Sequence, residues 1–182
     1  MYDYAGNNPA RYIGPNGSED KKIEWIMKNV PEQYRDKAIK SWEENRTIPG
    51  GTLTAKELAA ILFNETRSLS GEKIKQARKE VAHSIINADK KWKEKRSTYA
   101  KTAAKEAKVP EVESYIYEAC LEAAIEAVKE DEEGIDPTNN ALYFNFRKTD
   151  SKKEREGTKV HTSTGPLDNS YSEYKYANTY GD

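Results

Sequence analysis

The sequence predicts a mainly α-helical α+β fold with a small antiparallel sheet near the C-terminus. Apolar residues recur at helical spacing between residues 18 and 133, whereas residues 141–146 and 158–164 are short runs rich in aromatic or β-branched side chains. The chain of 182 residues is long enough to bury a real core in one domain. We expect the helices of residues 54–93 and 111–131 to form its centre.

Composition excludes several classes of protein. Charged residues make up 34% of the chain, but they balance to a net charge of −1, so no uniform field points to nucleic acid or to an anionic membrane. The single cysteine, Cys120, excludes an internal disulfide framework and reads as a small packed residue. We find no signal peptide at the start and no apolar run long enough for membrane insertion.

Two helices are predicted before residue 50. Ser18 can cap the first, which runs to about Asn29, and Pro31 restarts the chain at a position that favours a new helix. Trp25 and Trp42 lie at helical spacing with other apolar residues. This spacing favours packing, although an indole face also suits stacking on a sugar ring.

The next helix has a well-marked start. Thr54 and Glu57 have the spacing of a capping box, which fixes where the helix begins. From that start, Leu58, Leu62 and Glu65 fall on one stripe, so a carboxylate is expected on the face that points inward. Burial raises the pKa of a carboxyl group, and a general acid that works near neutral pH requires a raised pKa.

Glu65 also has a simpler interpretation. A glutamate at the end of an apolar stripe can be an edge residue that reaches solvent or pairs with a neighbour such as Arg67. Position alone does not separate this structural role from a catalytic one.

Two more helices follow the corner after Glu65. Ser70 can cap one that runs to Trp92, and Pro110 can start another that Gly134 ends. His83 is predicted to lie off the apolar stripe of the first, where it is weak support for a metal site. The inward residues predicted for the two helices are Ile74, Ala77, Val81, Ile85, Ala88 and Trp92, then Val112, Ile116, Ala119, Cys120, Ala123 and Ala127.

The C-terminal third has a different character. Residues 141–146 and 158–164 are predicted strands, and Gly165-Pro166 is expected to end the second one in a turn. Residues 167–182 are dense in Tyr, Asn and Ser, a composition that suits contact with a polar ligand. A loosely ordered tail is the alternative.

The sequence lacks the residue patterns of most common catalytic sites. The chain has no Gly-rich phosphate loop and no HExxH, GxSxG or CxxC motif, which removes the usual nucleotide, zinc-protease, esterase and dithiol sites. No cofactor and no metal is therefore expected. A glycosidic bond can be cut with one carboxylic acid that protonates the leaving oxygen and then acts as a base, and Glu65 would suffice for this.

Residues 1–17, MYDYAGNNPARYIGPNG, resemble the end of the core of Rhs-repeat proteins, which precedes a variable C-terminal domain. The matching positions are Tyr4, Gly6, Asn7, Asn8, Pro9, Tyr12, Pro15 and Gly17, while Gly14 stands where that family usually has Asp. The resemblance implies that residues 1–17 are a remnant of an Rhs shell and that residues 18–182 form a toxin domain.

A second resemblance covers residues 53–182. LAAILFNETRSLSGEKIKQARKEVAHSIIN and DPTNNALYFNFR are similar to the cell wall hydrolase family that includes the spore-cortex-lytic enzymes. The chain departs from that family's pattern at Thr66, Ser68, Ala88 and Asn140. The resemblance implies a lysozyme-like fold that acts on peptidoglycan glycan strands, with Glu65 as the catalytic acid.

The same resemblance implies where the glycan binds. Tyr143 and Asn145 would line a cleft from a strand, and four residues of the tail would position the glycan; as alternatives, these asparagines stabilise turns and these tyrosines are packed. The four tail residues are Asn169, Tyr171, Tyr176 and Asn178.

The outcome of the reaction depends on a second carboxylate. Glu72, Asp136 and Asp168 are available, but each sits where a helix cap or turn would use it. We therefore expect a lytic transglycosylase that cleaves between MurNAc and GlcNAc, with a hydrolytic muramidase as the alternative.

Two other readings stay open. One is a nuclease toxin at the C-terminal tip of an Rhs protein, which would use His83 or His161 for catalysis and bind phosphates through the basic run of residues 90–96. The other is a non-catalytic module that binds the cell wall. If the domain is a secreted antibacterial effector, as in type VI secretion, it would be delivered to the target cell's periplasm and would have a cognate immunity protein.

Overall fold

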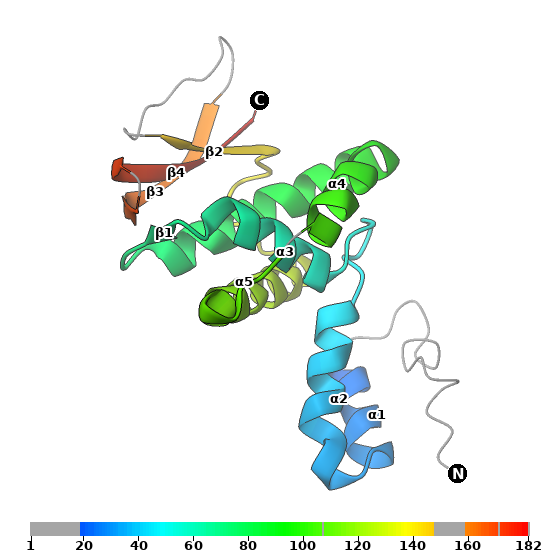
Figure 1. The fold of residues 1–182 in the computed structure, drawn as a ribbon. Helices are drawn as coiled ribbons and strands as arrows, with labels where there is room; N and C mark the ends of the chain where they lie inside the picture. Colours follow the sequence, from blue (N-terminus) through cyan, green and yellow to red (C-terminus); the bar gives the residue numbers. More distant parts are fainter. Residues whose placement is uncertain (1–18, 107, 148–158, 171, 182) are drawn as a thin grey trace. The chain divides into compact units, whose positions relative to one another are not determined.

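The computed structural model describes residues 19–106, 108–147, 159–170 and 172–181 (Figure 1). The chain divides into two compact units, Met1–Arg46 and Thr47–Asp182. The predicted boundary between residues 17 and 18 lies outside the described residues.

The first unit contains α1 (Glu19–Asn29) and α2 (Glu32–Asn45), with Pro31 at the N-cap of α2. Ile26, Val30 and Trp42 form its buried centre and Trp25 packs against them, so the packing role predicted for the two tryptophans is confirmed. The ammonium group of Lys22 lies 5.8 and 5.9 Å from the ring centroids of Trp25 and Trp42. Burial there lowers the pKa of Lys22 to about 8.

Three helices and a short 3₁₀ turn build one layer of the second unit. They are α3 (Ala55–Thr66), α4 (Ile74–Glu106), η3 (Glu111–Glu113) and α5 (Ser114–Glu132). Their facing surfaces are rich in alanine, which lets the helix backbones approach closely and makes one continuous core. The alanines that belong to this core are Ala55, Ala59, Ala77, Ala82, Ala123, Ala124 and Ala127.

The start of α3 is held from two sides. The capping box is present: Thr54 Oγ1 accepts from the backbone of Glu57, and the Glu57 carboxylate accepts from the backbone of Thr54, both at 3.1 Å. Asp89 on α4 accepts from the Thr52 backbone at 2.7 Å, the Thr52 hydroxyl at 2.7 Å and the Leu53 backbone at 3.1 Å. Gly51 lies so close to this carboxylate that a Cβ there would clash with it. The packing therefore requires a glycine at this position.

The second layer of this unit is an antiparallel sheet of four described strands in the order β1-β3-β4-β2. The strands are β1 (Leu69–Ser70), β2 (Tyr143–Arg147), β3 (Lys159–Asn169) and β4 (Ser172–Gly181). Figure 1 shows this sheet beside α4, and β2, β3 and β4 all contact that helix. The predicted α+β class is confirmed.

Three local predictions were wrong. Ser70 is not a helix cap, because it pairs with Asp168 in β1 and α4 begins only at Ile74. Val112 does not point inward but is 81% exposed, since η3 turns the chain before α5 begins. Gly165-Pro166 does not end the second predicted strand, because β3 continues to Asn169.

The proline is accommodated by an irregularity in the β3–β4 ladder. The register shifts between Thr164 and Leu167, and such a bulge leaves positions that need no ladder hydrogen bond. The composition of residues 167–182 suggested either contact with a ligand or a loosely ordered tail. Instead, most of these residues form strand β4, which lies between β3 and β2.

The helix α4 contains one break and ends later than its apolar stripe. Lys93 has non-helical φ and ψ values of 28° and −102°, and helix continues beyond it to Glu106, so much of the Ala- and Lys-rich stretch of residues 97–108 is helical. Among the described residues, no helix is both long and apolar enough to cross a membrane.

Asp89→Asn should lower the free energy of unfolding by about 2 kcal/mol, because one of its two acceptor oxygens becomes an NH₂ group that faces a donor. Thr52→Ala, which removes only the hydroxyl bond, should cost about 1 kcal/mol. Urea unfolding followed by circular dichroism measures both. Equal midpoints for Asp89→Asn and the wild type would contradict this role of Asp89.

Candidate functional site

Glu65 lies in the last turn of α3 and is exposed, so the prediction that it points inward was wrong. The buried residues of that turn are Leu62, Phe63 and Thr66. The inward stripe continues from Leu62 to Thr66, four residues on, which leaves Glu65 at its edge. The carboxyl group is therefore open to solvent at the end of a helix.

Partial desolvation nevertheless raises the pKa of the Glu65 carboxyl above its usual value. The C-terminal end of the helix dipole is negative and acts in the same direction. Within the described parts of the chain, the carboxylate has no hydrogen-bond or ion-pair partner that would offset these effects. Arg67, its expected partner under the structural interpretation, instead binds Glu113 at 2.6 Å and lies over the ring of Phe63.

The residue after Glu65 is firmly held. The hydroxyl of Thr66 donates to Leu62 O at 2.6 Å and accepts from Arg78 Nε at 3.1 Å, and Cys120 Sγ lies 3.8 Å away. Thr66, Arg78 and Cys120 are all buried. Burial raises the pKa of the Cys120 thiol, although the nearby Arg78 charge and the Thr66 hydrogen bond oppose this shift, which fits its predicted role as a packed residue.

The segment after Glu65 meets the second half of the chain through β1. Leu69 pairs with Asn169, and both the backbone N and the Oγ of Ser170 donate to Ser68 O, at 3.2 and 3.1 Å. The structure therefore brings Asn169 to the α3–β1 corner, as a site near Glu65 requires. Tyr171, predicted to bind glycan, lies outside the described residues.

Three other predicted binding residues share one face of the sheet. Tyr143 is opposite Tyr180 and Asn145 is opposite Asn178, and directly opposed residues project to the same side. The rings of Tyr143 and Tyr180 stack at 5.3 Å, and Trp92 lies 5.7 Å from Tyr143. This face is a row of aromatic and amide side chains.

The two asparagines form an incompletely satisfied pair. Asn178 Nδ2 donates to Asn145 Oδ1 at 3.2 Å, but the other polar atom of each amide is buried without a hydrogen-bond partner among the described residues. An unmet buried donor or acceptor costs about 1–3 kcal/mol, so this pair is not explained by stability alone.

Tyr176 lies opposite Arg147 across the β2–β4 ladder, on the same face as Asn178. Its ring packs against Gly165, where a Cβ would approach a ring carbon to 2.6 Å. Tyr176 is thus partly a packed residue, which was the structural alternative for it.

The described contacts do not join Glu65 directly to this row. The strand β2 lies three strands from β1, which is roughly 14 Å at the usual strand spacing. Asn169 is thus beside the Glu65 corner, whereas Tyr143, Asn145 and Asn178 are across the sheet. Only an extended ligand could contact both.

The two histidines are placed very differently. His83 is fully buried, with Nε2 3.7 Å from Glu130 and Nδ1 3.9 Å from Asp136, because α4 is covered on more sides than its apolar stripe indicates. Burial lowers the pKa of His83 despite the opposing charges of Asp136 and Glu130. His161 lies on β3 with Nδ1 2.8 Å from Thr138 O.

In the basic run of residues 90–96, which the nuclease interpretation requires for phosphate binding, two lysines already have partners within the protein. Lys90 pairs with Asp131 at 2.5 and 2.6 Å, and Lys91 lies over the ring of Trp92. The side chains of residues 94–96 lie outside the described part of the chain.

The carboxylates considered as second catalytic groups have local roles or are exposed. Burial would raise the pKa of Asp136, but hydrogen bonds from Thr138, Asn87 and Asn140 lower it below its usual value. Glu72 and Asp168 are exposed near β1. In the described residues, no three His, Cys, Asp or Glu side chains gather closely enough to hold a metal ion.

A further carboxylate was missed in the sequence. Glu80 on α4 is buried, accepts a short hydrogen bond from the Thr164 hydroxyl and accepts from Gln76 Nε2 at 3.3 Å. Neither Arg78 nor Glu80 stands out in the sequence, because charged residues on a helix usually face water. The only sign in the sequence that Arg78 and Glu80 are buried is that they lie beside the apolar stripe of Ala77, Val81 and Ile85.

Comparisons with protein-family models, curated proteins and solved structures found no match to this chain.

Glu65→Gln should stabilise the fold at neutral pH by less than about 1 kcal/mol, because the exposed carboxylate is partly screened by solvent. The folded protein holds the Glu65 proton more tightly than the unfolded chain, so the stability that this group contributes is lost as pH rises through its raised pKa. The variant and the wild type should therefore converge in acid, below the ordinary glutamate pKa of about 4.3.

Thermal unfolding over a pH series measures this difference. Glu122→Gln, at an exposed position on α5, is the matched control and should track the wild type throughout. A Glu65→Gln variant that is less stable than the wild type at neutral pH would show that the ionised carboxylate is favourably paired.

Proposed function

We propose that this protein is a peptidoglycan glycosidase with Glu65 as its general acid and base. The observation that supports this most is the setting of that residue: its carboxyl group is open to solvent, its pKa is raised by desolvation, and no described residue pairs with it. A general acid must keep its proton near the working pH and must reach its substrate. The raised pKa of Glu65 and the exposure of its carboxyl group support such a role at this position.

The arrangement of the sheet supports a polymeric glycan as the substrate. The segment that follows Glu65 pairs with Asn169 on β3. Asn178 on β4 pairs with Ser163, six residues or about 20 Å along β3 from Asn169, and Tyr143 and Asn145 lie on the next strand, β2. The exposed ring of Tyr143 can stack on a sugar face, whereas the amides of Asn145 and Asn178, whose free polar atoms are buried, would contact hydroxyl or acetamido groups only after a local opening. A single sugar could not contact both regions, whereas a glycan strand could.

The proposed reaction is that of a lytic transglycosylase. Glu65 donates its proton to the glycosidic oxygen as the bond from C1 of MurNAc to that oxygen breaks, and GlcNAc leaves with a free hydroxyl. The MurNAc 6-hydroxyl then forms a bond to C1 and gives its proton to Glu65, which yields the 1,6-anhydro product without consuming water. A muramidase with the same acid would use water in place of the 6-hydroxyl.

The choice between the two outcomes depends on a group that could activate water. Asp136 is engaged by three donor residues, and Glu80 is buried against Thr164. The exposed Glu72 and Asp168 near β1 are the carboxylates left to activate water, so the muramidase stays the alternative to the transglycosylase. The enzyme's biological setting would be that of an antibacterial effector released from an Rhs shell into the target cell's periplasm, with a cognate immunity protein that covers the Glu65 corner.

The rival nuclease is less well supported. His83, on α4, is buried against Glu130 and Asp136, so it cannot reach a phosphodiester in this conformation. His161 would have to act without it.

Glu65→Gln should reduce the release of soluble fragments from purified sacculi by about a hundredfold or more, because the amide cannot donate the proton. Mass spectrometry of the wild-type digest should detect 1,6-anhydro-MurNAc ends. Glu122→Gln is the control for a glutamate on the same helical layer and should retain full activity.

The possible outcomes separate the alternatives. Reducing ends without anhydro sugars would establish the muramidase and rule out the transglycosylase. Sacculus binding without any turnover by the wild type would favour the wall-binding module. Cleavage of RNA or DNA that is unaffected by Glu65→Gln would overturn the proposal.

Thr66→Val should lower kcat by about tenfold with little change in KM, because loss of the hydroxyl releases Arg78 and lets the end of α3 shift. Thr66→Ser keeps the hydroxyl and should restore kcat. Assays on soluble glycan fragments, with circular dichroism to confirm folding, measure this. A Thr66→Ser variant with the same kcat loss as Thr66→Val would contradict this role, because serine keeps the hydroxyl that accepts the hydrogen bond from Arg78.

A further inference from the structure

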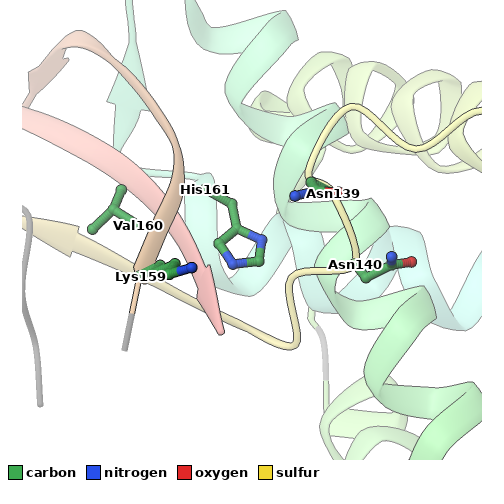
Figure 2. Close-up of a pocket in the computed structure, with 5 residues that line it drawn as sticks. All are labelled: Asn139, Asn140, Lys159, Val160 and His161. Carbon is green, nitrogen blue, oxygen red and sulfur yellow. The ribbon is translucent and has the colours of Figure 1, made fainter. Parts of the chain in front are cut away.

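A pocket of about 440 Å³ lies at the end of the sheet away from β1. Its lining residues are Asn139, Asn140, Lys159, Val160 and His161 (Figure 2). The strand β3 begins at Lys159, whereas β1 pairs with Asp168 and Asn169 at the other end of β3. At about 3.3 Å per residue, the pocket is roughly 25–30 Å along the strand from β1, so it is separate from the Glu65 corner.

One wall of the pocket is a turn held in an unusual backbone conformation. Asn139 and Asn140 have consecutive positive φ values of 51° and 62°, which non-glycine residues adopt at some cost. Asp136 holds the turn: it accepts from the Thr138 backbone at 2.8 Å, the Thr138 hydroxyl at 2.6 Å and the Asn140 backbone at 2.9 Å. The two asparagine side chains are thus presented from a fixed backbone.

The same turn is anchored to α4. Asn87 Nδ2 donates to Asp136 at 2.8 Å and to Ala141 O at 3.0 Å. Asp136, a carboxylate at the base of this wall, therefore already receives hydrogen bonds on both of its oxygens. Its oxygens are therefore occupied by donors of the turn and of α4, and not left as direct ligands for a cation in the pocket.

The opposite wall supplies an oriented imidazole and a cation. His161 Nδ1 lies 2.8 Å from Thr138 O, and because a carbonyl oxygen can only accept, Nδ1 carries a proton. The ring atom left for a ligand is Nε2. Figure 2 shows the ring of His161 between Lys159 on one side and the two asparagines on the other. Lys159 is exposed and forms no ion pair with a described residue.

We propose that this pocket binds an oxyanion, either a carboxylate or a phosphate group. Lys159 supplies the positive charge, and none of the five lining residues supplies a negative one. The amides of Asn139 and Asn140 donate to oxyanion oxygens. His161 Nε2 accepts from an adjacent hydroxyl when the ring is neutral and donates to the oxyanion when the ring is protonated.

The proposal is independent of the glycosidase activity and is tested by NMR on the whole chain. The wild type is titrated with inorganic phosphate and, separately, with acetate over about 0.1–20 mM, a range that covers dissociation constants near 1 mM. Ionic strength is held constant with sodium chloride. The amides of Asn139, Asn140, Val160 and His161 should shift together and saturate with at least one anion.

Lys159→Gln should weaken this binding by about tenfold, since it removes a charge-assisted contact. Lys73→Gln, at an exposed position just before α4 and near the other end of β3, is the matched control and should bind like the wild type. Glu65→Gln should also bind like the wild type. Saturation with phosphate alone would identify a phosphate source, and saturation with acetate alone would identify a carboxylate source.

Two results would overturn the assignment. The first is the absence of saturable shifts at these amides with either anion. The second is unchanged affinity in Lys159→Gln, which would place any bound anion elsewhere.

Discussion

The Thr47–Asp182 unit depends on hydrogen bonds that one helix, α4, makes through buried or partly buried polar side chains. Each of these side chains reaches a different segment: the end of α3, strand β3, the turn before β2, and the loop that leads into α3. Because such groups lose water on folding, each is tolerated only while its partner is in place. The pairs are Arg78 with Thr66, Glu80 with Thr164, Asn87 with Asp136, and Asp89 with Thr52.

Among these four contacts, the one from Arg78 holds the residue next to the candidate catalytic residue, whereas no described residue holds Glu65 itself. Arg78 immobilises Thr66, the residue next to Glu65, while the Glu65 carboxyl receives no such support from described residues. A carboxyl group that is partly desolvated and unpaired is unfavourable for stability when ionised. The proposed role of Glu65 as a general acid requires a group of this kind.

The sheet connects two separate polar regions. At one end of β3, Asn169 meets the segment after Glu65, and at the other end Lys159 and His161 face the turn of Asn139 and Asn140. Asn87 on α4 holds that turn through Asp136, in the same way that Arg78 holds the α3 corner. The second region was not foreseen, because the sequence shows only a DPTNN turn and an isolated histidine more than 20 residues apart.

The sequence by itself determined the start of α3, the α+β class and most of the core. Capping at Thr54 and Glu57 and the spacing of Leu58, Val81 and their neighbours are local properties, which the residues themselves encode. Only the tertiary structure decided which polar residues are buried and which are open. Glu65 was expected inside and is exposed, whereas Glu80 and His83 are buried, because helical period cannot show how many sides of α4 are covered. Pairing between residues about a hundred positions apart, such as Leu69 with Asn169, likewise left no local signal, and that pairing brings the end of β3 to the corner beside Glu65.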